Sequence, residues 1–272
     1  MKRKKVLLLS FCIAVLCILL AVPLLLRSTP APEPIDKQQA ITRAINYIKD
    51  TNEPDALLML NVMYRRFGIA EFAGALQRYD QILAEEPPGA PVMRLFRRIA
   101  DHNNPLQVDD WDKVTFDVDF LTIPALYCNQ YGLPDDYSAQ LVQAANSGEY
   151  MLTHALLAWI WIQENGCEVQ LPDGFIEQLY RANAALIDDN AVVNDLELEA
   201  AAFLYLAGQG TLVNDAFIER VVAVQNSDGG WLYSSDTSNA SYWHATVVAL
   251  LFLLHVEHPA NSYPPMLAPA SP

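Results

Sequence analysis

Apolar side chains along residues 36–258 recur at intervals of three and four positions, as they do on one face of an α-helix. Few stretches alternate apolar and polar residues in the way that is typical of a half-buried strand. The periodic segments end at Pro, Gly, Asn or Asp, residues that favour turns and helix ends. The pattern therefore predicts an all-α domain over residues 36–258.

Two kinds of predicted helix alternate along this domain. The first kind is amphipathic, and examples cover residues 41–48, 175–181 and 217–224. The second kind is apolar on every side, and it covers residues 56–64, 150–162, 200–208 and 245–254. A helix that is apolar all round is buried all round, and none of these runs reaches the roughly 20 residues that cross a membrane. The alternation predicts an outer set of helices around a buried inner set.

A weak internal repeat supports this pairing. Residues 134–141 are echoed by residues 172–179 and, more loosely, by residues 214–221. Periods near 40 residues with two helices per unit are typical of a helical solenoid or of a closed ring of hairpins. We expect five or six hairpins, over residues 38–66, 70–103, 108–131, 136–165, 172–208 and 213–257. The third is the weakest, because Pro124 lies in its apolar run and should start or kink a helix.

Two short motifs lie near the end of the domain. Gln225, Asp228, Gly229, Gly230 and Trp231 resemble the Gln-Trp repeat of squalene and hopene cyclases, and residues 242–246 (YWHAT) resemble an inner-helix entry of protein prenyltransferase β subunits. In those families the Gln ends an outer helix, the Trp packs back against the barrel, and the His of the second motif binds zinc. The resemblance implies an α/α toroid of five or six hairpins, with inner and outer rings.

The catalytic motifs of these families are not found in this chain. Residues 108–112 (VDDWD) and 117–119 (DVD) do not have the order of the Asp-x-Asp-Asp acid of the cyclases. No Asp-x-Cys accompanies the His, as the prenyltransferase zinc site requires. Thioester domains share the toroid, but residues 167–170 (CEVQ) keep only the outer residues of their Cys-Gly-Glu-Gln. These departures favour a binding domain over an enzyme.

The N-terminal residues predict the location. A basic segment, residues 1–5, precedes residues 6–26, which carry no charge and are long enough to span the roughly 30 Å of a hydrocarbon core. We expect a single-pass signal-anchor helix at 6–26 with its N-terminus in the cytoplasm; a cleaved signal peptide is the alternative. A Pro-rich linker, 27–35, then leads to an extracytoplasmic domain in the periplasm of a bacterial inner membrane. Residues 259–272 have the composition of a disordered Pro-rich tail.

Charge and cysteine content narrow the partners. The chain beyond residue 27 holds all 32 acidic residues and 12 of the 17 basic ones, so its net charge is −20. So acidic a domain is unsuited to nucleic acid, and the expected partner is a small molecule, a glycan or a peptide. Cys128 and Cys167 either pair in an oxidising compartment or remain separate buried thiols.

Side chains at the starts of inner helices would line a pocket at one end of a toroid. The candidates for acid–base catalysis are His154, His244, Glu197 and Asp117. The candidates for the pocket wall are Tyr242, Trp243, Tyr127, Asp119 and Glu199. Structural roles are the alternative: a hydrogen-bonded histidine, a carboxylate at a helix N-terminus, or a solvated acidic loop over residues 109–119.

Three functions follow from these residues. The preferred one is a membrane-anchored toroid that binds a ligand or partner without turnover and needs no cofactor. The first alternative is an enzyme at the His154/His244 end, either with zinc held by these histidines or with acid–base chemistry. The second is a structural scaffold of an envelope complex, which predicts no ligand-sized cavity and a large apolar surface patch.

Overall fold

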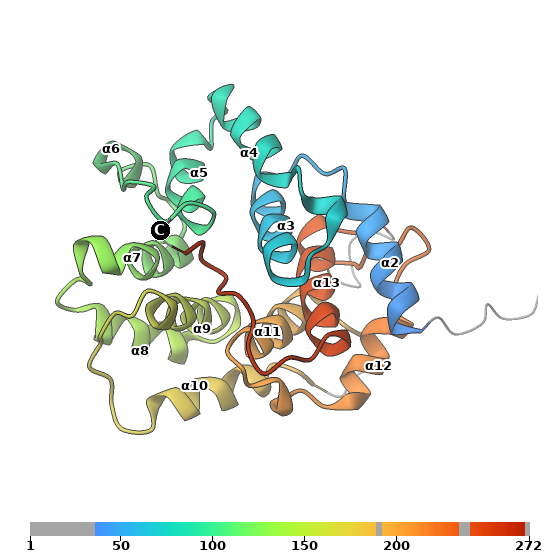
Figure 1. Cartoon of the computed structure of the whole chain (residues 1–272). Helices are drawn as coiled ribbons and strands as arrows, with labels where there is room; N and C mark the ends of the chain where they lie inside the picture. The colour runs from blue at the N-terminus through green and yellow to red at the C-terminus, as the bar shows by residue number, and fades with distance from the viewer. Residues whose placement is uncertain (1–35, 189–191, 234–239, 270–272) are drawn as a thin grey trace, which may run out of the picture. The chain divides into compact units, whose positions relative to one another are not determined.

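The computed structural model describes residues 36–188, 192–233 and 240–269, and the helices of this part lie within one compact unit, residues 35–272 (Figure 1). These described residues form helices, turns and an isolated bridge between Trp231 and Tyr242, without a strand. The all-α prediction is therefore confirmed. The predicted signal-anchor helix and linker lie outside the described residues, among which no helix is long and apolar enough to cross a membrane.

The helices follow one another in pairs, as the sequence predicts. Their bounds are α2 Lys37–Ile48 and α3 Pro54–Phe67; α4 Ala75–Ala84 and α5 Ala90–Phe96; α6 Val108–Trp111 and α7 Asp117–Tyr131; α8 Tyr137–Ser147 and α9 Glu149–Glu164; α10 Phe175–Ala184 and α11 Asp195–Leu206; α12 Asp215–Ala223 and α13 Trp243–Glu257. Short 3-10 turns lie at η1 Ala70–Phe72, η2 Arg97–Ile99 and η3 Gly210–Leu212.

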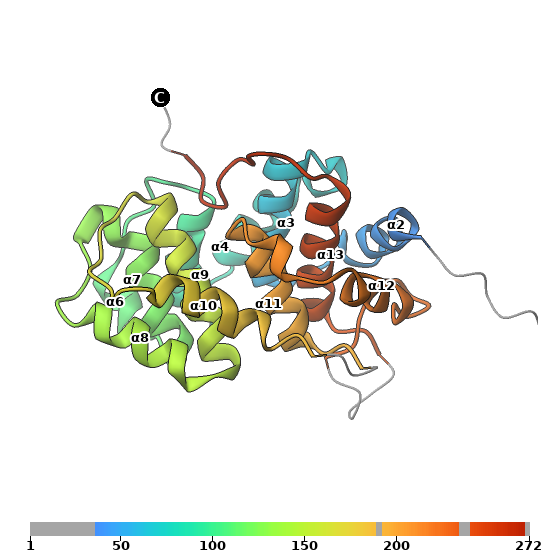
Figure 2. The ribbon, with the colours of Figure 1, turned by 90° about the horizontal axis from the view of Figure 1, so that it is seen from below.

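The second helix of most pairs is buried on all sides. Helices α7, α9, α11 and α13 contact one another in that order, and α3 packs on α13 (Figures 1 and 2). Helices α2, α8 and α10 cover this buried set from outside, and α4 covers α3. Every residue from Ala245 to His255 is buried, whereas residues 213–225 are about half exposed. The alternation of apolar and amphipathic helices therefore predicted burial correctly.

The internal repeat marks the starts of three covering helices. Tyr137 begins α8, Phe175 begins α10, and Phe217 lies in the first turn of α12. All three aromatic side chains are buried. Each repeat unit thus places one aromatic anchor where the chain turns into a covering helix.

The third pair departs from the pattern. Its first helix, α6, is a single turn, and α7 begins at Asp117 and continues through Pro124 instead of starting there. Proline removes the amide donor that would bond the carbonyl oxygen of Phe120. Phe120 is 40% exposed, so water can satisfy that oxygen and the helix continues.

The Gln-Trp motif forms the turn after α12. Gln225 Nε2 donates to Gly229 O at 2.8 Å, and Gly230 N donates to Asp228 Oδ1 at 3.1 Å. Trp231 is 1% exposed, and its Nε1 donates to the carbonyl oxygen of Val221 at 2.8 Å. The structural roles that the sequence predicts for these residues agree with these contacts.

The same turn also joins the last helix pair to the first helix. Gln225 Nε2 donates to Ala40 O at 2.8 Å, and Arg43 Nη2 donates to Asn226 O at 2.6 Å. Gly229 has a φ of +100°, and a Cβ there would lie 2.4 Å from Arg43 O. The glycine is therefore required by both backbone conformation and close approach.

Cys128 and Cys167 form a disulfide with a Cα–Cα distance of 6.2 Å. It joins the last turn of α7 to the segment after α9. This pairing resolves the alternative that the sequence left open.

Residues 259–269, which we call the C-terminal strap, are packed rather than disordered. Met266 is 1% exposed and Leu267 6% exposed. Both backbone amides donate to the Glu164 carboxylate, at 2.7 and 2.9 Å, and Arg65 Nη2 donates to Met266 O at 2.6 Å. The expectation of a disordered tail was wrong for these residues, because partners distant in sequence satisfy their backbone; residues 270–272 lie outside the described part.

Candidate functional site

A cavity of about 780 Å³ lies among the buried helices. Helices α3, α5, α7, α9 and α13 supply most of its lining, together with residues 113–116 and the strap. Its polar residues gather where α3, α7 and α13 begin and beside the second turn of α9. Trp161, in the last turns of α9, and Met266 of the strap lie beyond them. The cavity is therefore polar at one end, the head end, and apolar at the other, the floor.

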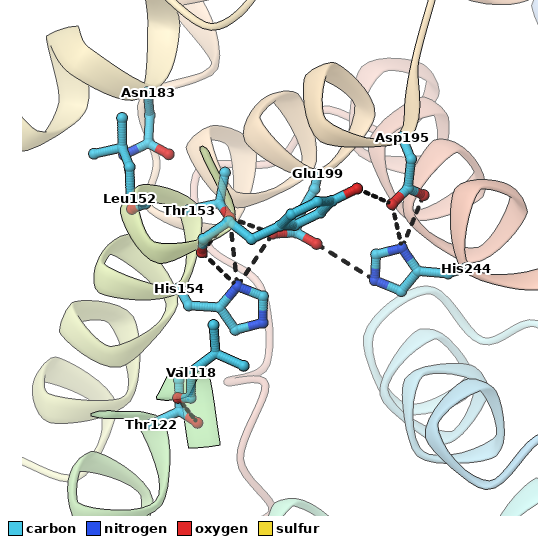
Figure 3. A network of polar contacts seen from close by, with 10 residues as sticks. Val118, Thr122, Leu152, Thr153, His154, Asn183, Asp195, Glu199 and His244 are labelled. Atoms are coloured by element: carbon cyan, nitrogen blue, oxygen red, sulfur yellow. Dashed lines mark hydrogen bonds and ion pairs between the residues drawn. The ribbon is translucent and has the colours of Figure 1, made fainter. Parts of the chain in front are cut away.

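A chain of alternating carboxylates and imidazoles forms the head end (Figure 3). His244 Nδ1 lies 2.8 and 2.9 Å from the two carboxylate oxygens of Asp195, and His244 Nε2 lies 3.4 Å from Glu199 Oε2. The other oxygen of Glu199 lies 3.3 Å from His154 Nδ1. Glu199, which is fully buried, therefore connects two histidines that lie 90 positions apart in sequence.

Two neighbouring hydroxyls hold this chain in place. Thr153 Oγ1 donates to Glu199 Oε1, and Tyr150 OH donates to Asp195 Oδ2 at 2.8 Å. Helix α9 positions both groups beside His154, since the three residues lie within its first two turns. The site thus depends on α9, α11 and α13 together.

The hydrogen bonds fix the proton positions of His154. Its Nδ1 lies 2.8 Å from the carbonyl oxygen of Tyr150, which only accepts, so Nδ1 carries a hydrogen. Its Nε2 has no hydrogen-bond partner among the described residues, and the side chain lines the cavity. One nitrogen of His154 is therefore left for a ligand.

The surroundings of each group in the His154–Glu199–His244–Asp195 chain shift its pKa. Burial disfavours the charged form of both histidines, but the Glu199 carboxylate outweighs it at His154 and raises the pKa. Burial likewise opposes charge at His244, where Asp195 outweighs it and raises the pKa. The pKa of Glu199 is lowered, since His154 outweighs the effect of burial. Each histidine therefore faces a carboxylate that favours its protonated form.

Two further carboxylates face the cavity without a partner. The side chains of Asp55 and Asp119 make no hydrogen bond or ion pair with any described residue. Burial raises the pKa of Asp119 to about 6, and it also raises the pKa of Asp55. Asp55 is exposed and Asp119 is half-buried, and neither has a cation in direct contact, so these two carboxylates are the ones that a cationic ligand could reach.

The structure brings together part of the predicted site. His154, His244, Asp119 and Trp243 line the cavity, and Glu199 lies directly behind the histidines. The test that the sequence sets, whether both histidines reach one cavity, is met. This agreement supports the reasoning that residues at inner-helix starts converge.

The other four candidates lie elsewhere. Glu197 forms a capping box with Asn194 at the start of α11, and Asp117 is exposed in the first turn of α7. Tyr127 is buried, and its OH donates to Leu95 O at 2.9 Å. Tyr242 is the N-cap residue of α13, packs edge-on against Tyr233, and does not line the cavity.

The sequence reasoning missed several residues of the site. Asp55 and Asp195 lie in the first turns of α3 and α11, so the rule that selected Asp119 also applies to them. Nothing in the sequence favoured selecting Thr153, which is neither titratable nor in the first turn of its helix. The acidic loop was also misjudged in part, since Asp110 is buried and binds Arg94 through two hydrogen bonds of 2.8 and 2.7 Å.

The geometry at the head end is unsuited to zinc. Within the described ranges, no group of three or more His, Cys, Asp or Glu side chains is placed to hold a metal ion. Nδ1 of His154 is committed to Tyr150 O, and both nitrogens of His244 face carboxylate oxygens. Neither histidine thus points a free lone pair at a point shared with the other.

No family model, curated protein or solved structure matches this chain. The interpretation of the site therefore rests on its geometry and chemistry.

Proposed function

We propose that this domain binds an amphipathic cation in the cavity, without turnover. The observation that carries the proposal is a ligand-sized cavity with an apolar floor and two unpaired carboxylates, Asp55 and Asp119, at its head end. Cavities of this size bury most of a small ligand, and a few polar groups fix its orientation. The cavity itself counts against the scaffold interpretation, which predicts none.

Charge balance favours a cationic head group. His154 and His244 are already paired with Glu199 and Asp195, so they offset the charges of Asp55 and Asp119 only in part. Among the described residues that line the cavity, Lys113 is the only lysine or arginine. A primary or quaternary ammonium group would supply the missing positive charge, and the Trp243 ring at the same end suits a cation as well.

The proposal extends to fold and location. We propose an α/α toroid like that of the cyclases and prenyltransferases, with α3, α5, α7, α9, α11 and α13 as the inner ring. The domain would stand outside the cytoplasmic membrane, anchored by residues 6–26 and facing the periplasm. The disulfide between Cys128 and Cys167 supports this location, since such bonds persist in oxidising compartments.

A comparison of head groups tests the proposal. Decylamine, decanol and decyl sulfate share one apolar chain, and each would be titrated against the purified protein by calorimetry at neutral pH. We expect the amine to bind tightest and the sulfate weakest. Equal affinity for the amine and the sulfate would refute a cation site.

An acid–base enzyme is the second candidate. The observation that favours it is the free Nε2 of His154, whose ring is oriented by Glu199 and Tyr150 O. His154 could take a proton from water as that water attacks an ester carbonyl, which releases an acid and an alcohol. Decanoylcholine combines a cation and an ester, so its hydrolysis tests this candidate. Turnover that is lost in His154→Gln but kept in Glu197→Ala would replace binding by catalysis.

A further inference from the structure

The C-terminal strap lies across the floor of the cavity. The Met266 side chain lines the cavity, and its Sδ accepts from Trp161 Nε1 at 3.3 Å. The backbone on either side is fixed, because Glu164 accepts from the amides of Met266 and Leu267, and Arg65 donates to Met266 O. Met266 is thus held from three directions with its side chain toward the cavity.

A second set of contacts secures the strap further upstream. Arg66 Nη1 donates to Pro264 O at 2.7 Å, and its guanidinium lies 4.7 Å from the centre of the Tyr263 ring. That ring packs edge-on against Phe67 and His255. Beyond Met266, the amide of Ala268 donates to Ile99 O at 2.8 Å. The strap is anchored before and after the residue that reaches the cavity.

The spacing along α9 relates the two ends of the cavity. His154 at the head and Trp161 at the floor are seven residues apart, which is roughly 10 Å of helix. A ligand whose head meets Asp55 and Asp119 would therefore extend its apolar chain toward Trp161 and Met266. The chain can grow only until it meets the Met266 side chain.

We propose that Met266 sets the maximum length of the apolar chain that the cavity accepts. This inference rests on the proposed binding of an amphipathic cation. Each methylene group that finds room in an apolar cavity raises affinity about fourfold, and one that does not fit adds nothing. Affinity should therefore rise with chain length and then stop rising at a length that the floor determines.

Leu267 provides a matched control. It belongs to the same strap and is almost as buried as Met266, but it does not line the cavity. A change at Leu267 loosens the strap without altering the floor directly. Effects of strap stability can thus be separated from effects of cavity length.

The experiment uses the full-length chain, kept in an amphipathic polymer so that no detergent chain competes. Amines with a terminal bromine, from hexyl to tetradecyl, are titrated, and the quenching of tryptophan fluorescence gives each affinity. We expect Met266→Ala to move the longest favourable chain upward by about three methylene groups and Met266→Phe to move it downward. Met266→Leu and Leu267→Ala should keep the wild-type length.

A general loss of folding cannot shift the favoured chain length upward in one variant and downward in the other. The Ala and Phe variants together therefore distinguish a change in cavity length from misfolding. An unchanged optimum in both variants would overturn the length limit while leaving the cation site intact. Failure of every amine to bind the wild-type protein would overturn the proposed function and this inference with it.

Discussion

The head end of the cavity and the strap region behind its floor use the same residue types in different ways. Beside the strap, where its ring packs against Tyr263, His255 donates from Nδ1 to Leu251 O at 2.8 Å and accepts at Nε2 from Arg66 Nε at 3.1 Å. At the head, His154 makes the same bond from Nδ1 to Tyr150 O, but its Nε2 has no partner among the described residues. The helical hydrogen bond is thus common to both, and the second nitrogen distinguishes a structural histidine from one available to a ligand.

Glu164, which is half-buried, and Glu199, which is fully buried, differ in the same sense. Glu164 accepts two backbone amides of the strap, whereas Glu199 meets a hydroxyl and two imidazoles, and its Oε2 lacks a well-aligned hydrogen bond. Backbone amides do not titrate at any ordinary pH, whereas imidazoles gain or lose a proton near neutral pH. The polar groups beside the strap are therefore structural, and those at the head end can respond to charge.

Loss of the central glutamate should have the largest effect. Glu199→Ala removes a fully buried carboxylate and leaves two half-buried histidines without their shared partner, which costs about 3 kcal/mol of unfolding free energy. Glu197→Ala, two residues away, removes a capping-box bond and a long bond from the amide of Asp188, and should cost about 1 kcal/mol. Urea unfolding followed by circular dichroism measures both; equal losses would contradict the difference.

The pH dependence of that loss has a defined sign. The lowered pKa of Glu199 gives stability that is present above its ordinary value of 4.5 and lost as pH falls. The raised pKa of His154 gives stability that is present below 6.5 and lost as pH rises past the folded value. The difference in unfolding free energy between the wild-type protein and Glu199→Ala should thus be largest from about pH 4.5 to 6.5.

Removing the other glutamate should release the strap and leave the head end intact. Glu164→Ala deprives two amides of a charged acceptor, for which we expect a loss of about 2–3 kcal/mol. Hydrogen exchange should increase in residues 263–268 and remain unchanged in residues 150–156. Faster exchange at both ends would mean that they are not independent.

Asp119→Asn should weaken the binding of decylamine about tenfold, since one charge-assisted contact is lost. With a pKa of about 6, Asp119 takes up a proton below that pH, so wild-type affinity for the amine should fall as pH drops through 6. The variant should show a smaller fall in affinity, because only Asp55 then remains to take up a proton at this site. Asp117→Asn changes an exposed carboxylate of the same turn and should bind like wild type.

The smallest expected effect is a difference in protonation between His255 and His154. Burial lowers the pKa of His255 to about 4, whereas the pKa of His154 is raised above 6.5. Nitrogen-detected NMR titration should thus find His255 neutral and His154 charged at pH 6. If His255 and His154 take up a proton at the same pH, their different surroundings do not change their pKa values in the expected way.

Helical periodicity explains why much of the fold could be predicted from the sequence. Runs such as residues 245–254, apolar on all sides, can only be buried, and residues at inner-helix starts converge on one cavity. Orientation around a helix was harder to predict. Glu197 and Glu199 are about 200° apart on α11, as Asp117 and Asp119 are on α7, so one of each pair faces away from the cavity.

The strap could not be predicted from composition. Its prolines favour disorder, and its order depends on Arg65, Arg66 and Glu164, which lie 100 to 200 positions earlier in sequence. Local patterns do not reveal such distant partners. The same holds for Asp110 and its ion pair with Arg94, which turned an apparently solvated acid into a buried one.

The turn at Gln225–Trp231 also determines when the domain can finish folding. Its bonds to α2 span 183 to 185 residues, and the bond from Tyr47 OH to Ser241 O spans 194. Contacts so distant in sequence cost loop-closure entropy before they stabilise anything, which slows folding. During synthesis, α2 emerges before the other helices of the described domain and must wait for nearly the whole chain before its final neighbour exists. An unfinished chain would therefore expose the inward face of α2.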